Sequence, residues 1–375
     1  MLSQSIIFSG AILGLFLILL IQSKIEKSKA DTWLMLSLGM SACLLLFYYD
    51  NLSSQPILPK FIQFFGFSLP LLSSPILYFY IKTLSLGSEP LSKKRLLHFI
   101  PFLVVFLIFI SNHQSIFIAK GYPHYHALTS NFVIYFTTFS LAIVSGVYSI
   151  LSLKILYKYQ KSLPHTHSFT EEITLNWLKW IVLVNLFMFL ILFCIIKFGV
   201  NIGLLTYENL FDVVGTILSL YVLFLGYFGF KQTTFFTNFN YNSGIEESSK
   251  AIYRNSGLNG TNIEQIFEKL EIHLEQNKPY LDENLNLFTL AQQIQVTSNQ
   301  LSQVINQKTS SNFFNYINRY RIEAVKTMLK DPVFAHYSIL GVGFECGFRS
   351  KSSFNKIFKD LEGITPSEYQ KNQLK

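Results

Sequence analysis

The sequence predicts an all-α protein in two parts, a seven-helix transmembrane bundle followed by a soluble all-helical domain with two helix-turn-helix units. Residues 1–231 form a series of apolar segments, whereas residues 279–375 are polar and repeat their apolar residues at helical spacing. Charged residues make up only 14% of the chain, against roughly a quarter in ordinary globular domains. Of the 30 Lys and Arg residues, 16 fall after residue 230, in the much shorter part.

Seven segments of the first part are apolar enough for transmembrane helices, which need about 20 mostly apolar residues. They are residues 5–21, 33–49, 61–82, 96–110, 132–153, 180–196 and 211–230. The fourth is short, which indicates a re-entrant or differently tilted helix. Pro70 and Pro75 predict a kink in the third segment. Asn185 is the main polar side chain inside a segment, and we expect it to make an interhelical hydrogen bond.

Basic residues between the segments indicate the side of the membrane on which each loop lies. The loops after the first, third and fifth segments, with their edges, hold eleven Lys or Arg residues, whereas the alternate loops hold only Lys60, Lys120 and Lys197. Basic residues concentrate in cytoplasmic loops, so the N-terminus is expected outside and the C-terminal domain in the cytoplasm. An odd number of segments agrees with this multi-pass topology.

The apolar part shows no pattern typical of catalysis, transport or metal binding. Its ionisable residues lie at segment edges, as in Asp50, His98, Lys197, Asp212 and Lys231, whereas an ion path would place them deep inside. Two His pairs lack further ligands, and the three cysteines have no metal-ligand spacing. We therefore expect no enzyme activity, no metal and no cofactor. A transporter or enzyme whose helical tail only regulates it is the alternative interpretation.

Residues 232–278 are expected to join the two parts. Residues 232–262 are rich in Asn, Ser, Thr and Gly, a composition typical of linkers. A helix is predicted over residues 262–276, with an apolar stripe of Ile263, Ile266, Phe267, Leu270 and Leu274. The stripe either packs on the following domain or pairs with a second copy of the chain in a homodimer.

Residues 279–375 contain two helix-turn-helix patterns. In the first, a helix from Leu287 precedes a turn at Gln295-Val296 and a second helix capped by Ser298; in the second, a turn at Gly347-Phe348 precedes a helix capped by Ser350. The second helix of such a unit enters the major groove of DNA. The side chains expected to face outward from these two helices are Asn299, Gln300, Gln303, Asn306, Arg349, Lys351, Ser352, Asn355, Lys356 and Lys359.

These residue types fit DNA recognition. Asn and Gln bind adenine edges with paired hydrogen bonds, and Arg or Lys bind guanine. Lys and Arg also neutralise phosphates, which adds affinity without sequence preference. We expect Asn299, Gln300 and Gln303 to discriminate bases, and Lys351 and Lys356 to attract phosphates.

A set of fixed spacings connects this domain to a known family. The set comprises Gly347-Phe348, Ser350, Phe354, Phe358-Lys359, Gly363 and Thr365-Pro366-Ser367-Glu368-Tyr369, together with Leu290-Ala291, Leu301, Phe314, Arg321 and Ala324. On these residues, positions 280–371 resemble the AraC/XylS-type transcriptional regulators. Gly343 stands where the family usually has Ala, and Gln370 stands where it often has Arg, which removes one phosphate contact.

The resemblance does not reach the apolar part, which looks like that of family members with a multi-span sensor in place of a soluble ligand domain. Together, the apolar segments and the resemblance predict a membrane-tethered, sequence-specific transcription regulator in the bacterial cytoplasmic membrane. The tether suggests that a membrane or external signal is coupled to gene expression. The expected partners are double-stranded DNA, the lipid bilayer, RNA polymerase and a second copy of the chain. The alternative is a DNA-binding regulator that its transmembrane segments anchor passively.

Overall fold

The computed structural model describes residues 2–25, 27–53, 57–87, 93–112, 116–119, 122–125, 131–170, 173–194, 198, 207–243, 260–334 and 336–373. The chain forms two compact units. The first unit comprises residues 1–157 and 176–241, and the second comprises residues 158–175 and 242–375. The second unit therefore contains a segment from the middle of the apolar part, which comprises the end of α6 (Asn131–Thr166) and the connection to α7 (Asn176–Cys194).

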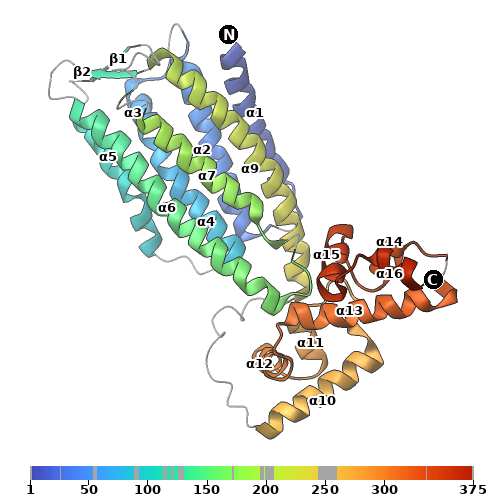
Figure 1. Cartoon of the computed structure of the whole chain (residues 1–375). Coiled ribbons are helices and arrows are strands. Elements are labelled where there is room, and N and C mark those ends of the chain that lie inside the picture. Colours follow the sequence, from blue (N-terminus) through green and yellow to red (C-terminus); the bar gives the residue numbers. More distant parts are fainter. Residues whose placement is uncertain are drawn as a thin grey trace. The chain divides into compact units, whose positions relative to one another are not determined.

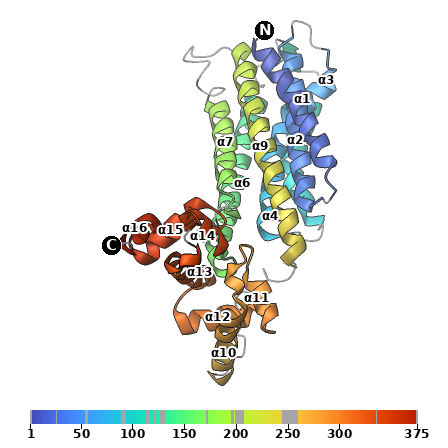
Figure 2. The same cartoon turned by 90° about the vertical axis from the view of Figure 1, so that its right-hand side faces the viewer.

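Long helices run side by side through the first unit (Figures 1 and 2). They are α1 (Leu2–Gln22), α2 (Lys29–Asn51), α3 (Lys60–Ser68), α4 (Ser73–Leu86), α5 (Ile100–Ser111), α6 (Asn131–Thr166), α7 (Asn176–Cys194) and α9 (Tyr207–Ser243). The 3₁₀ helices η1 (Leu69–Leu72) and η2 (Lys93–Phe99) precede α4 and α5. The helical prediction is confirmed in its coarse form, but the chain also forms a short antiparallel hairpin of β1 (Ile116–Ala119) and β2 (Tyr122–Tyr125).

Five stretches of the described residues are long and apolar enough to cross a membrane, and two apolar helices are shorter. The shorter ones, residues 95–111 and 176–191, coincide with the fourth and sixth predicted segments. Within the third predicted segment the α-helix changes to the 3₁₀ helix η1 around Pro70, which lacks a backbone donor: α3 ends at Ser68 and α4 begins at Ser73. Helix α9 continues to Ser243, well beyond the predicted end at residue 230.

A buried polar pair joins two helices of the first unit. The Ser74 hydroxyl of α4 donates a hydrogen bond of 2.8 Å to the Asn185 side-chain oxygen of α7. Both residues are buried. The predicted interhelical hydrogen bond of Asn185 is thus confirmed. Because the two side chains hydrogen-bond to each other, burying their polar atoms in an apolar environment costs less free energy.

The C-terminal part of the second unit is a chain of short, capped helices. They are α10 (Gly260–Asn277), η7 (Pro279–Leu281), α11 (Leu287–Gln293), α12 (Ser298–Thr309), α13 (Phe313–Lys330), η8 (Pro332–Phe334), α14 (Ile339–Glu345), α15 (Lys351–Glu362) and α16 (Pro366–Gln373). Helix α15 is capped by Ser350, as predicted. Helix α12 is capped by Thr297 and not by Ser298, because the Thr297 hydroxyl accepts the Gln300 backbone N–H.

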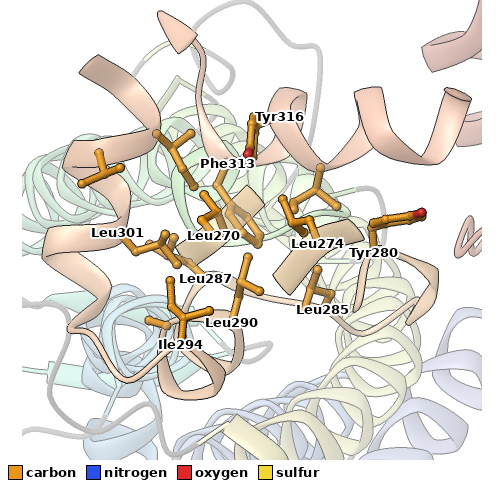
Figure 3. Packing of buried hydrophobic residues seen from close by; sticks show 14 of the residues in the cluster. Leu270, Leu274, Tyr280, Leu285, Leu287, Leu290, Ile294, Leu301, Phe313 and Tyr316 are labelled. Atoms are coloured by element: carbon orange, nitrogen blue, oxygen red, sulfur yellow. The ribbon is translucent and has the colours of Figure 1, made fainter. Parts of the chain in front are cut away.

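The apolar stripe of α10 packs inside this unit. Figure 3 shows Leu270 and Leu274 among side chains of α11 and α13. Ile266, Leu270 and Leu274 are all buried there. Of the two interpretations of the stripe, packing on the following domain is therefore correct. A homodimer through Ile266 and Leu270 is not supported, since their side chains are already covered.

A second apolar cluster holds the C-terminal helices together. Val325 of α13, Val342 of α14 and Phe354 and Phe358 of α15 are buried in it. A side chain at Gly343 would begin 3.0 Å from the Phe354 ring. Glycine at this position therefore lets α14 approach α15 more closely than the Ala usual in the similar family would.

Candidate nucleic-acid interface

Helices α11 and α12 form the first helix pair. The turn lies at Gln295, whose φ of 58° is left-handed, and the Val296 N–H returns to the Ala291 carbonyl at 2.9 Å. The predicted turn at Gln295-Val296 is thus confirmed. A left-handed turn after a short helix reverses the chain tightly, as a helix-turn-helix unit requires.

Helix α12 has one buried and one polar side. Leu301, Val304 and Ile305 are buried against the first core cluster. The predicted site residues divide by exposure: Asn299 and Asn306 are exposed, whereas Gln300 and Gln303 are half-buried. None of the four amide residues is fully buried, but only Asn299 and Asn306 are exposed.

One of these amides also caps the helix. The Gln300 side-chain oxygen accepts hydrogen bonds of 3.0 Å from both the backbone N–H and the hydroxyl of Thr297. With the return bond from the Gln300 N–H, this is a capping box. Gln300 was predicted to recognise bases, and in the structure it also stabilises the start of its own helix.

Helices α14 and α15 form the second helix pair, and the turn between them requires glycine. Gly347 has a φ of +85°, and a Cβ there would lie 2.5 Å from the Tyr280 carbonyl oxygen. Both the conformation and the close approach exclude a side chain. The Phe348 N–H then closes the turn on the Gly343 carbonyl at 3.1 Å.

The polar side of α15 carries three lysines. Phe354, Ile357 and Phe358 are buried on the other side. Every predicted site residue within α15 is exposed, namely Lys351, Ser352, Asn355, Lys356 and Lys359. These three lysines therefore project from the unit, where they can meet phosphates.

Arg349 differs from the other predicted site residues. It is half-buried, and its guanidinium carbon lies 4.5 Å from the centre of the Phe169 ring. This distance is in the range of a cation–π interaction. Arg349, Phe169, Ser350 and Ser353 line one small cavity of about 20 Å³. Arg349 is thus less exposed than predicted, because it packs on Phe169.

A buried polar cluster that the sequence pattern does not predict lies next to this cavity. Arg321 is 1% exposed. Its Nε donates to the Tyr280 carbonyl at 2.8 Å and its Nη2 to the Asp282 carbonyl at 2.8 Å. Its Nη1 and Nη2 also donate to the carbonyl and the hydroxyl of Ser168, at 3.2 and 3.1 Å. Burial lowers the pKa of Arg321 to about 10, so the guanidinium remains charged at neutral pH.

Further hydrogen bonds hold Ser168 in place. Its hydroxyl donates to the Leu285 carbonyl at 2.6 Å, and its carbonyl accepts the Asn318 side-chain amide at 3.0 Å. The neighbouring His167 forms a β-bridge with Asn286. Burial lowers the pKa of His167 to about 4, so its ring is neutral at physiological pH. Local sequence carries no signal for contacts that span more than a hundred residues.

Residues 290–372 match the protein-family model described as a helix-turn-helix domain, which is of the AraC type. The matched range contains all ten predicted site residues and complete helices α12 to α15. No curated protein and no solved structure matches the chain. The match shows a helix-turn-helix domain within the C-terminal part of the chain, and it supports DNA binding by that part.

Proposed function

We propose that this chain is a membrane-tethered regulator that binds specific DNA sequences through two helix-turn-helix units. One observation carries the proposal. Within the range that matches a helix-turn-helix domain, α12 and α15 each follow a tight turn and present a polar side opposite a buried side. In such units the second helix enters the major groove.

The two helices differ in the chemistry that they offer to DNA. The predicted contacts of α12 are the amides Asn299, Gln300, Gln303 and Asn306, which suit adenine edges. Helix α15 offers Lys351, Lys356 and Lys359, which suit phosphates. Helix α12 therefore supplies base discrimination, and α15 supplies most of the attraction to the DNA backbone.

The apolar helices of the first unit tether the regulator to a bilayer. Five stretches of the described residues have the length and hydropathy of membrane spans, and two shorter apolar helices bring the proposed number to seven. The distribution of basic residues then places the C-terminal domain in the cytoplasm, where bacterial DNA and RNA polymerase are accessible. A signal that binds one packing state of the helical bundle more tightly than another would shift the bundle toward that state and thereby change regulation.

Genome occupancy of the intact protein tests this proposal. Cells that express the full chain are crosslinked, and the recovered DNA is compared with that of a Lys351→Ala/Lys356→Ala variant. A few enriched sites that share a sequence and weaken in the variant are expected. The recovered sequence is then titrated with full-length protein in lipid nanodiscs, with a scrambled duplex as control. Equal binding to both duplexes would contradict sequence-specific recognition.

A further inference from the structure

The segment between α6 and α7 is built into the second unit. We define residues 167–170 as the strap. Ser168 and Phe169 of the strap are 1% and 6% exposed. Ser168 contacts α13 through Asn318 and Arg321, and contacts the chain just before α11 through Leu285. Both oxygens of Ser168 are thereby engaged, so the strap is held by specific hydrogen bonds as well as by apolar packing.

The strap also packs beside the residues that lead into α15. Phe169 lies against the Arg349 guanidinium, one residue before the Ser350 cap. Ser350 and Ser353 line the same small cavity as Phe169. In helix-turn-helix proteins, the N-terminal residues of the second helix contact base edges. Phe169 therefore holds Arg349 at the end of α15 that a DNA major groove would take, although Lys351 and Ser352 in the first turn are exposed.

We infer that the strap is an autoinhibitory element that competes with DNA for the N-terminal end of α15. While it is seated, Arg349 is held on Phe169 and is withdrawn from the groove. When it leaves, Arg349 and the start of α15 are open to DNA. This inference rests on the proposed function, because it assumes that α15 binds DNA.

The position of the strap in the chain gives it a means of control. It follows directly on α6, which is one continuous helix from Asn131 to Thr166. The stretch before the strap is also fastened to the stretch after it: the Tyr159 hydroxyl donates to the Ile173 carbonyl at 3.0 Å, and the Gln160 amide to the Thr174 carbonyl at 2.5 Å. A signal that shifts α6 would therefore shift the strap, and the strap and DNA binding would be linked reciprocally.

Full-length protein in lipid nanodiscs, titrated with a fluorescent duplex recovered from genome occupancy, tests the inference. Phe169→Ala removes the ring on which Arg349 packs and should tighten DNA binding about 2- to 10-fold, the range expected from a cation–π contact of moderate strength. Phe169→Leu keeps an apolar side chain but removes the aromatic ring. It should also tighten DNA binding, and it replaces the alanine variant in the test if that variant is unstable. Tyr157→Ala is the matched control, since it removes a ring that is 68% exposed.

A double-mutant cycle separates this role from general packing. In an Arg349→Ala background, Phe169→Ala should tighten DNA binding less than it does in the wild-type chain, because the strap no longer has an arginine to withhold. Hydrogen exchange adds a second readout: amides of residues 168–170 should exchange slowly without DNA and faster when the duplex is bound. Continued protection in the DNA complex would overturn the inference.

The possible failures are distinguishable. If the wild-type protein binds the recovered duplex but neither Phe169 variant binds it more tightly, the strap is not inhibitory, and the proposed function stands. If the wild-type protein binds no duplex better than a scrambled one, the proposed function fails, and the inference fails with it.

Discussion

The Arg321 guanidinium donates hydrogen bonds to both oxygens of Ser168, a residue 153 positions earlier in the chain. Its remaining bonds go to the carbonyls of Tyr280 and Asp282 and to the side-chain oxygen of Asn318. A buried cation is costly unless its donors are satisfied. The C-terminal helices thus rely on a residue from the middle of the apolar part to complete their polar core.

Ser168→Ala should therefore destabilise the second unit. The substitution removes an acceptor for Arg321 and a donor to the Leu285 carbonyl at 2.6 Å. We expect the free energy of unfolding to fall by about 1–3 kcal/mol, as for hydrogen bonds to charged groups. Urea-dependent hydrogen exchange of the full chain measures it. Ser162→Ala is the matched control, because that hydroxyl donates within its own helix, to Tyr159; equal effects of the two variants would contradict the assignment.

Leu270→Ser should destabilise the same unit and should not act by preventing dimerisation. Leu270 is 0% exposed in the core of Figure 3, and a large-to-small change at such a site costs about 2–5 kcal/mol. The same exchange measurement applies, with the exposed Glu268→Ser as control on α10. A Leu270→Ser protein of normal stability that fails to activate or repress its target would restore the dimer interpretation.

Helix α10 could be predicted from local sequence, whereas the packing of the strap could not. The stripe of α10 repeats at three- and four-residue steps, so its helix and its buried face follow from local periodicity. Glycine at Gly347 and the cap at Ser350 are equally local, and both were predicted. Local sequence does not determine which surface the α10 stripe packs against, so the following domain and a second copy of the chain were both open. The structure shows Leu270 and Leu274 in the core of the following domain.

The contacts of Ser168 and Phe169 could not be predicted from the sequence, for a physical reason. Their partners Asn318, Arg321 and Arg349 are about 150 residues or more away in sequence, so no periodicity connects them. A short polar loop between two apolar segments also resembles any cytoplasmic connection. Arg349 was consequently predicted on an open face, whereas the structure packs it on Phe169.

Reporter fusions should test the membrane topology. A fusion after Ser243 keeps α9 whole, and it should report the cytoplasm because the loops on that side carry the excess of basic residues. A fusion after Lys120, between the fourth and fifth predicted segments, should report the exterior. Paired alkaline phosphatase and fluorescent protein fusions provide the measurement, and their expression levels provide the control. The same side for both positions would exclude seven spans.

Gln303→Ala should relax base preference more cleanly than Gln300→Ala. The Gln300 oxygen already accepts two hydrogen bonds from Thr297, so its loss also weakens the cap, by about 0.5–2 kcal/mol for a capping interaction. Loss of Gln303 should cost about 1–3 kcal/mol of discrimination at one or two base pairs. Binding to a panel of single-base variants of the recovered site measures this. Uniform weakening on every duplex would assign Gln303 to backbone contact.

Lys356→Ala should weaken binding to every duplex and should lower the salt dependence. Lys356 is exposed on the polar side of α15, where a phosphate contact releases counterions when DNA binds. Removing one such contact reduces the slope of log affinity against log salt by about one. Full-length protein is titrated with recovered and scrambled duplexes at several salt concentrations. Lys330→Ala removes the same charge from the exposed end of α13 and is the control.

If Lys330→Ala lowers the slope as much as Lys356→Ala does, the effect reflects net charge and not contact by α15. If Lys356→Ala changes base preference at an unchanged slope, then α15 reads bases and the division of roles between the two helices is reversed.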